Sequence, residues 1–267
     1  MFWEIGFKPL LMAILNITPD SFSEDGEMNP ECALNRALQM EEDGADIIDV
    51  GGQSTRPGFK KISPEEEIKR VEPVLKLLKK NIKILISIDT FYPDVVEVAL
   101  NYGVNIINDV TGFKNIKMIN KVAKSDCGLI VVHGMKTLKN PKIHKCNRDI
   151  IKEIQYFFNK QLIKLKESGI DNKRICFDPG IGFAKTYEEN LKIIKNIKNL
   201  KIENIPILIG ASRKRIVSIS SGQTKSLCGT IAIHSIASFL GANIIRCHDV
   251  KETRFALNSV YAILKSQ

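Results

Sequence analysis

ILISID, residues 84–89, is a short apolar run that ends on a residue capable of chemistry, Asp89, and the chain repeats this pattern eight times. The eight runs are LLMAILN (10–16), ADIIDVGG (45–52), ILISID (84–89), NIINDV (105–110), GLIVVH (128–133), ICFDPG (175–180), PILIGASRK (206–214) and NIIRCHD (243–249). Apolar runs of this length, bounded by turn residues, are typical of strands buried in a parallel sheet.

Segments with helical periodicity lie between consecutive runs, and helix-start signals mark their ends. Asn29-Pro30 offers a cap followed by proline at the first helical position. Residues 63–66 (SPEE) and 186–189 (TYEE) have the capping-box pattern, and Pro73 is expected to kink or divide the helix that follows the first of them.

Strand and helix alternate eight times, with crossovers long enough for parallel pairing. An open doubly wound sheet would need a switch point, and no glycine-rich dinucleotide fingerprint marks one in the sequence. We therefore predict an α/β fold, a (β/α)8 TIM barrel, as a single domain over residues 1–267.

Composition narrows the class of protein. The hydrophobic content of 44% is ordinary for a buried core, and no stretch approaches the 18 consecutive apolar residues of a membrane span. The start of the chain lacks the pattern of a signal peptide. Six cysteines are scattered without a C-x-x-C pair, which favours reduced thiols in the cytoplasm.

The formal net charge of +9 indicates either a nucleic-acid partner or an anionic substrate. The lysines alternate with apolar residues in helix-like segments, which is typical of solvated helix faces. No aromatic-rich basic patch or nucleic-acid motif is present, so we expect no nucleic acid among the partners.

Three loops at the predicted barrel mouth carry the chemistry: ILNITPDSFSEDG (14–26), GGQSTRPG (51–58) and DPGIGFAK (178–185). The carboxyl ends of parallel barrel strands meet at one mouth, so these loops converge on one pocket. Any one of them alone could be a simple turn, because Gly, Pro, Asp and Ser are the usual turn residues.

Together with SIDT (87–90), NDVTG (108–112), GASRK (210–214) and the R-x-H-D at 246–249, these loops resemble the dihydropteroate synthases, the pterin-joining enzymes of folate biosynthesis. The resemblance covers nearly the whole chain, from Ile14 to Val250, with the motifs in the family's order. It implies that a hydroxymethyl-dihydropterin diphosphate loses diphosphate and that the amine of 4-aminobenzoate takes its place. It also implies a Mg²⁺ cofactor, two small-molecule substrates, no membrane partner and a homodimer.

The resemblance assigns Asp89, Asp178 and Lys214 to catalysis and pterin binding. The two carboxylates accept hydrogen bonds from the pterin's amino and ring NH groups, while Asn108 supplies a mixed donor and acceptor. The family's leaving group departs ahead of attack, so positive charge develops on the pterin. A carboxylate about 4 Å from that charge contributes about 4 kcal/mol at an effective dielectric near 20, or roughly three decades in rate. The same resemblance adds Val110 and Gly182 to the substrate site.

Binding of the diphosphate requires positively charged side chains and hydrogen-bond donors. Arg246 and His248 lie two apart on the last strand and share a face, and Arg56 offers a forked guanidinium. Asn16 matches the family's magnesium position, where phosphate oxygens and water complete the shell.

The second substrate site is expected to contain Phe183, Thr55, Pro57 and the loop at 18–23. The aminobenzoate ring would pack on Phe183, with its carboxylate at the helix start after Lys214. The loops at 17–28 and 53–62 are expected to act as lids.

Each assignment has a plainer interpretation. Asp89 and Asp178 could be turn or cap residues, His248 a core histidine and Lys214 a surface lysine. Phe183 could simply pack under its turn. His133 is expected to be structural.

The chain departs from the family pattern at several positions: Gln53 stands where glutamate is common, SFSEDGE (21–27) contains an apparent insertion, Val132 replaces a frequent methionine, and Arg215 and Cys247 replace a frequent serine and valine. None of these changes removes a predicted catalytic group.

Two alternative functions stay open at this point. A methyltetrahydrofolate–corrinoid methyltransferase shares the pterin-binding barrel, but it has no diphosphate to bind, and the STRPG loop (54–58) and the Arg246–His248 pair argue against it. A paralogue that binds pterin without catalysis is disfavoured by the intact Asp89 and Lys214.

Overall fold

The computed structural model describes residues 3, 6, 8–17, 23–24, 27–53, 61–134 and 149–266, with only the backbone at 23–24 and 27–28. Its strands form a parallel barrel with the neighbour order β8-β7-β6-β5-β4-β1-β10-β9. The strands are β1 (Leu10–Asn16), β4 (Ile47–Gly51), β5 (Leu85–Asp89), β6 (Ile106–Asp109), β7 (Gly128–Val132), β8 (Ile175–Asp178), β9 (Leu208–Ile209) and β10 (Ile244–Cys247).

The two ends of this sheet meet and close the barrel. A parallel bridge joins Phe177 of β8 to Ile207, next to β9, and the Phe177 N–H donates to the Pro206 carbonyl at 2.8 Å. The predicted (β/α)8 barrel is therefore confirmed.

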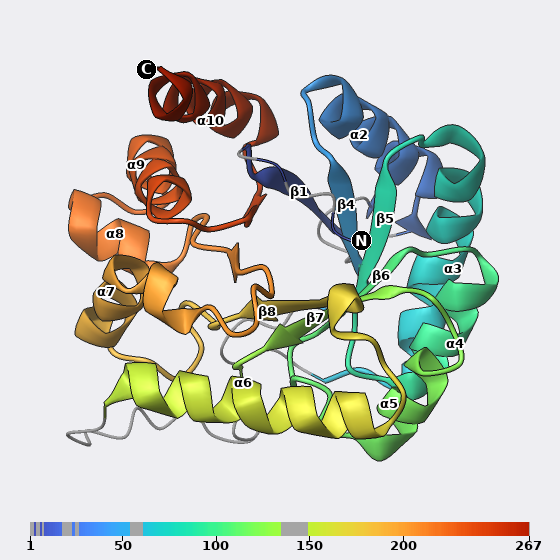
Figure 1. Cartoon of the computed structure of the whole chain (residues 1–267). Helices are drawn as coiled ribbons and strands as arrows, with labels where there is room; N and C mark the ends of the chain where they lie inside the picture. Colours follow the sequence, from blue (N-terminus) through green and yellow to red (C-terminus); the bar gives the residue numbers. More distant parts are fainter. Residues whose placement is uncertain are drawn as a thin grey trace.

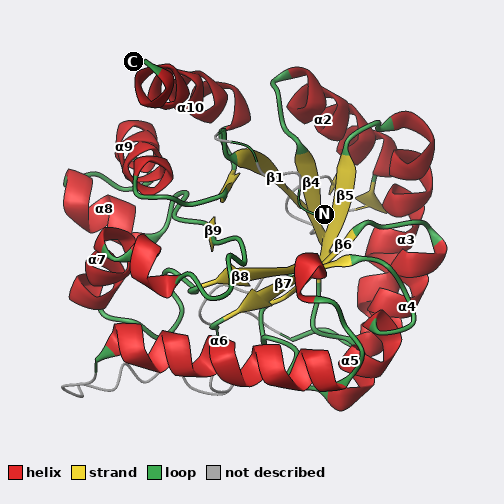
Figure 2. Ribbon diagram, viewed as in Figure 1, coloured by secondary structure: helices red, strands yellow, loops and turns green. Residues whose placement is uncertain are grey.

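Helices surround the strands, as Figures 1 and 2 show. They are α2 (Pro30–Glu42), α3 (Pro64–Asn81), α4 (Pro93–Asn101), α5 (Ile116–Val122), α6 (Ile150–Glu167), α7 (Tyr187–Lys195), α8 (Arg215–Ser221), α9 (Leu227–Phe239) and α10 (Val250–Lys265). Short 3₁₀ turns lie at Asn172–Arg174 and Ile197–Leu200, and β2 (Ser23–Glu24) pairs with β3 (Glu27–Met28) in the loop after β1. Among the described helices, none is both long and apolar enough to cross a membrane.

The helix-start signals behave as predicted at α2 and α7, and only in part at α3. Asn29 caps α2, and both bonds of the capping box form between Thr186 and Glu189 at the start of α7. At α3, only one bond of the predicted capping box forms. The Ser63 side chain accepts from the Glu66 N–H at 3.2 Å, but the Glu66 carboxylate pairs with Arg70 Nε at 2.8 Å instead of turning back to Ser63.

Pro73 does not divide α3, which runs unbroken from Pro64 to Asn81. The apolar side chains on both sides of the proline, Val71, Val74, Leu75 and Leu78, are almost completely buried. We attribute the continuity of the helix to this packing, which offsets the loss of one backbone hydrogen bond.

Alternate residues along each strand point into the barrel, which places the site. The part of the interior away from the carboxyl ends of the strands is filled by one apolar cluster: Trp3, Met12, Ile47, Ile106, Ile130, Val132, Cys176, Leu208 and Ile244. Two residues further along β4, β6 and β10, the same inward face carries Asp49, Asn108 and Arg246. Polar chemistry thus lies on an apolar floor at the carboxyl end of the barrel.

Candidate active site

A buried charged network occupies the centre of the barrel. The Arg246 Nε donates to Asp49 Oδ2 at 2.7 Å, and its Nη2 donates to Asp89 Oδ2 at 2.8 Å. The Asn108 amide also donates to Asp49 Oδ2, at 3.0 Å. Four strands therefore contribute to a cluster built around one guanidinium.

Asp49 is a site residue that sequence reasoning missed. Its side chain is fully buried, and its second oxygen, Oδ1, has no hydrogen-bond partner in the described part of the chain. The signal was an acid at an inward position inside the apolar run of β4. A buried carboxylate on such a strand is costly unless it is paired.

The network carries two carboxylates for one guanidinium. Burial raises the pKa of Asp89 well above its usual range, Arg246 pulls it down, and the negative charge of Asp49 adds to the rise. Burial acts to lower the pKa of Arg246, but Asp49 and Asp89 more than reverse that effect. Arg246 stays charged, so the centre of the site favours an additional positive charge.

Asp178 ends β8, and Lys214 directly precedes α8 in the loop after β9, the strand that pairs with the strand of Arg246; we call these two residues the Asp178–Lys214 wall. Asp178 accepts from the Gly180 N–H at 2.7 Å, and its pKa is raised by burial, with Lys214 opposing the rise. Burial lowers the pKa of Lys214 to about 8, against an opposing effect of Asp178. The same lysine is electrostatically coupled to Asp89, which links this wall to the central network.

The turn after β8 brings two more predicted residues, Gly182 and Phe183, against Lys214. The Lys214 Nζ donates to the Ile181 carbonyl at 2.7 Å and lies 5.0 Å from the centre of the Phe183 ring. At Gly182, where φ is +83°, a Cβ would lie 3.2 Å from the lysine Cδ. A side chain at this position would be strained and would crowd Lys214.

Lys185, which the sequence reasoning did not single out, holds this turn in place. Its ammonium donates to the backbone carbonyls of His133 and Gly180, each at 2.9 Å, and of Phe183 at 3.1 Å. Its position at the end of the DPGIGFAK motif was the one sequence feature that could have pointed to this role. Its three hydrogen bonds fix the loop beneath Phe183.

The residues that the sequence analysis assigned to the diphosphate lie at the end of β10 and beside it. The Ser212 hydroxyl and the His248 Nδ1 are 2.9 Å apart, and the His248 N–H donates to the same hydroxyl at 3.2 Å. Asn16 ends β1 on the other side, where a Cβ on Gly51 would meet Asn16 Oδ1 at 3.6 Å and Asp89 Cβ at 3.8 Å.

Some of the remaining predicted residues are not among those that the structure describes. Thr55, Arg56 and Pro57 lie outside the described residues, as do 18–22 of the first loop. Val110 is 3% exposed and packs in the main core, so its substrate contact stays a prediction. His133 lies 3.7 Å from Glu153 and against the Phe157 ring.

Four of the residues that depart from the family pattern lie among the described residues, and two of them, Val132 and Cys247, are buried in the core. The Gln53 side chain accepts from the Ile62 N–H at 2.9 Å. Arg215 begins α8 and is exposed.

Comparison with known proteins gives a consistent result. Residues 12–248 match the family model of the pterin binding enzymes. The dihydropteroate synthase of Clostridium beijerinckii is 38% identical, over 98% of this chain and 97% of its own length.

Solved structures agree. A dihydropteroate synthase from Clostridium difficile, determined in the presence of pteroic acid, superimposes with a TM-score of 0.92 at 37% identity, over 99% of this chain and all of its own. The enzyme from Xanthomonas albilineans with 4-aminobenzoic acid gives a TM-score of 0.89 at 33% identity, over 97% of this chain and 94% of its own.

Proposed function

Because this chain belongs to the dihydropteroate synthases of the pterin binding enzyme family, we propose how its own residues carry out that family's reaction. The protein is a transferase of folate biosynthesis that condenses 6-hydroxymethyl-7,8-dihydropterin diphosphate with 4-aminobenzoate. The C–O bond to the diphosphate breaks with its electron pair leaving on the diphosphate. The aminobenzoate nitrogen then forms the new C–N bond and loses one proton, giving 7,8-dihydropteroate.

The observation that carries the residue roles is the pair of buried carboxylates that share Arg246. Asp89 faces the mouth at the end of β5, where its negative charge stabilises the cation that develops on the pterin. A carboxylate about 4 Å away contributes about 4 kcal/mol at an effective dielectric near 20. We assign recognition of the pterin's amino and NH groups to Asp178 and Asn108, with Lys214 against the ring.

The diphosphate is assigned to the Arg246–His248 side of the pocket. The Asp49 and Asp89 carboxylates hold the Arg246 side chain in position, so it loses little side-chain entropy on binding. The aminobenzoate ring is assigned to Phe183, next to Lys214, with Thr55, Arg56 and Pro57 retained from the sequence analysis as further substrate contacts.

A Mg²⁺ ion fits the donors at the end of β1. The described residues contain no group of three or more His, Cys, Asp and Glu side chains that could hold a metal by themselves. Asn16 offers a hard amide oxygen, and one protein ligand completed by phosphate oxygens and water is characteristic of Mg²⁺. The bound ion would neutralise charge on the leaving diphosphate.

We also propose a homodimer in the cytoplasm. Large apolar side chains are exposed on neighbouring helices, with Ile236 and Phe239 on α9 and Phe255 and Ile263 on α10, which supports association of two copies. The described cysteines, Cys32, Cys127, Cys176, Cys228 and Cys247, are free thiols, as expected in a reducing compartment. Light scattering and cell fractionation test these two proposals.

The direct test of function is diphosphate release from the pterin diphosphate with 4-aminobenzoate, with and without Mg²⁺. We expect release that needs both the amine and the metal. Binding of the pterin diphosphate without any release would instead indicate a non-catalytic paralogue, and turnover that depends on cobalamin would indicate a corrinoid methyltransferase.

A further inference from the structure

The turn that presents Lys214 to the active site, residues 211–214, has an unusual backbone. Arg213 has a φ of +58°, in the left-handed region that residues other than glycine rarely adopt. The Lys214 N–H donates to the Ala211 carbonyl at 3.1 Å and closes the turn. Such a conformation persists only where the surrounding structure holds it. The contacts around the turn therefore decide where Lys214 lies.

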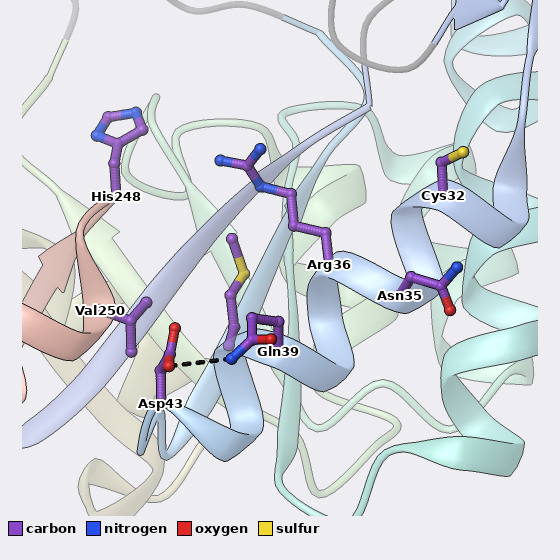
Figure 3. Close-up of a pocket in the computed structure, with 8 residues that line it drawn as sticks. Cys32, Asn35, Arg36, Gln39, Asp43, His248 and Val250 are labelled. Atoms are coloured by element: carbon purple, nitrogen blue, oxygen red, sulfur yellow. Dashed lines mark hydrogen bonds between the residues drawn. The ribbon is translucent and has the colours of Figure 1, made fainter.

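Two of these contacts hold side chains of the turn rather than its backbone. The Arg213 side chain forms an ion pair with Asp249, but it is 39% exposed, and exposed ion pairs contribute little stability. The Ser212 hydroxyl lies 2.9 Å from Nδ1 of His248. The His248 ring, drawn in Figure 3, also lines a groove outside the barrel. Neither contact fixes the backbone of the turn from the protein interior.

The backbone of the turn is held from the interior by α9, which lies beside α8 in Figure 1. The Ala211 N–H donates to Nε2 of His234 at 3.2 Å, and the Arg213 N–H donates to the Thr230 hydroxyl at 3.4 Å. Thr230 and His234 are four residues apart on α9, so they project from the same face of the helix. The Thr230 hydroxyl gives its own proton to the Ser226 carbonyl at 2.9 Å, which leaves its lone pairs to accept.

Close packing fixes α9 against α8, the helix that directly follows Lys214. A Cβ at Gly229 would lie 2.9 Å from Ser221 Cβ and 3.0 Å from Val217 Cγ1, so there is no space for a side chain at this position. The close approach of the two helices sets the position of His234 relative to the turn.

His234 is the more informative of the two acceptors. It is 1% exposed, and the N–H that it accepts requires an unprotonated Nε2, so the neutral ring carries its proton on Nδ1. Burial lowers the pKa of His234 to about 3; the charge of Lys214 adds to this effect, and that of Asp249 opposes it. Nδ1 has no hydrogen-bond partner within the described part of the chain, which is costly for a buried donor. An apolar side chain would avoid that cost, so stability alone does not explain the histidine.

We propose that His234, through its hydrogen bond to the backbone of the 211–214 turn, is a positioning residue that places Lys214 against the pterin. The inference rests on the proposed function, because the pterin contact of Lys214 does. With the turn held, the Lys214 Nζ lies 2.7 Å from the Ile181 carbonyl and 5.0 Å from the centre of the Phe183 ring. Without the Nε2 acceptor, the turn loses one of its two buried anchors, and Lys214 spends less time at that place.

The test is calorimetric binding of the pterin diphosphate to the wild type, His234→Leu and His234→Gln. Leucine fills the space but cannot accept, whereas the glutamine amide oxygen can take the place of Nε2. We expect about tenfold weaker binding for His234→Leu and binding within about twofold of the wild type for His234→Gln. Thr230→Val removes the second acceptor with little change of shape. It should weaken binding in the same direction, and it takes over the test if His234→Leu does not fold.

Hydrogen exchange of the Ala211 amide tests the anchor without any ligand. This amide should exchange faster in His234→Leu than in the wild type and stay protected in His234→Gln. Leu257→Ala is the control for lost stability, since Leu257 is fully buried on α10 and is not part of the site described above. It should lower the free energy of unfolding but keep the wild-type affinity for the pterin diphosphate.

Three results would overturn the positioning role: wild-type affinity in His234→Leu, an equal loss of affinity in a folded His234→Gln, or an equal loss in Leu257→Ala. The proposed function fails separately. If His234→Leu weakens binding of the pterin diphosphate but the wild type releases no diphosphate with 4-aminobenzoate, the positioning role stands and the proposed function fails.

Discussion

Buried acids lie on both sides of the backbone of Gly51 and Gly52, which we call the glycine strip. The acids on the two sides differ in their partners. On the barrel side, Asp49 and Asp89 share the Arg246 guanidinium. On the outer side, Glu67 of α3 is fully buried, and neither of its carboxylate oxygens has a hydrogen-bond partner among the residues that the structure describes. A Cβ on Gly51 would touch Asp89, whereas one on Gly52 would collide with Glu67.

The pKa values of the two regions do not separate them, because burial raises the pKa of Asp89 to about 7 even though Arg246 opposes the rise. Burial raises the pKa of Glu67 to about 7; the nearby Thr90 hydroxyl and Arg70 offset part of the rise, and the charge of Asp89 adds to it. The barrel acids, in contrast, keep a permanent cation beside them. We infer that the paired acids are held for chemistry, whereas the isolated acid mainly affects stability.

The largest effect is expected from Arg246→Ala, which removes the cation from the paired acids. It should lower kcat/KM for the pterin diphosphate about 10³-fold and cost about 3–5 kcal/mol of unfolding free energy, because two buried carboxylates lose their partner. Steady-state kinetics and denaturant titration measure both effects. Arg213→Gln, which breaks a more exposed pair with Asp249, is the control and should cost less than about 1 kcal/mol. Weaker binding of aminobenzoate alone would contradict the assignment of the diphosphate end.

Asp89→Asn should come next, with kcat lowered about 10²–10³-fold. The amide keeps the size of the side chain but loses the charge that matters most as the cation forms. Rapid-quench measurement of diphosphate release gives the rate. Glu67→Gln is the matched control across the glycine strip and should keep wild-type turnover; unchanged turnover in Asp89→Asn would remove Asp89 from catalysis.

Glu67→Gln should instead change stability, and in a pH-dependent way. The raised pKa means that the folded protein binds this proton more tightly than the unfolded chain does, so stability falls as the pH rises from about 4.5 through 7. At pH 8 the variant should therefore gain up to about 3 kcal/mol over the wild type, relative to the difference at pH 4. Urea unfolding at the two pH values tests this, and an equal difference at both would show that the pKa of Glu67 is not raised in the folded state.

Gly52→Ala should have the smallest effect, because it only crowds the strip between the two regions. The new Cβ would lie 2.6 Å from Val71 Cγ1 and 2.8 Å from Glu67 Cγ, so we expect a loss of about 1–3 kcal/mol. Thermal unfolding measures it. The double variant with Val71→Ala should lose less than the sum of the single variants, and strict additivity would mean that the predicted collision does not occur.

The sequence predicted the barrel well because each strand is an apolar run with a polar end. All eight main strands lie within the predicted runs, and Asn29 and Thr186 cap their helices as expected. The β2–β3 hairpin was not predicted, since two-residue strands leave no periodic signal.

The site was less predictable than the fold. Asp89, Asn108, Asp178, Lys214 and Arg246 are brought together, but the sequence could not indicate that Arg246 pairs with Asp49, 197 residues away. That pairing depends on barrel closure and strand register, which no local pattern encodes. Asp49 itself was hidden because an acid inside an apolar run resembles an ordinary strand residue.

The central claim is that the network around Arg246 and the Asp178–Lys214 wall enclose one pterin diphosphate. A crystal structure of this chain with a non-hydrolysable analogue of that substrate tests it most directly. We predict the pterin ring within hydrogen-bond distance of Asp178 and Asn108, with the phosphates beside Arg246 and His248. A ring bound outside the barrel mouth, or phosphates on the Asp178 wall, would contradict the account.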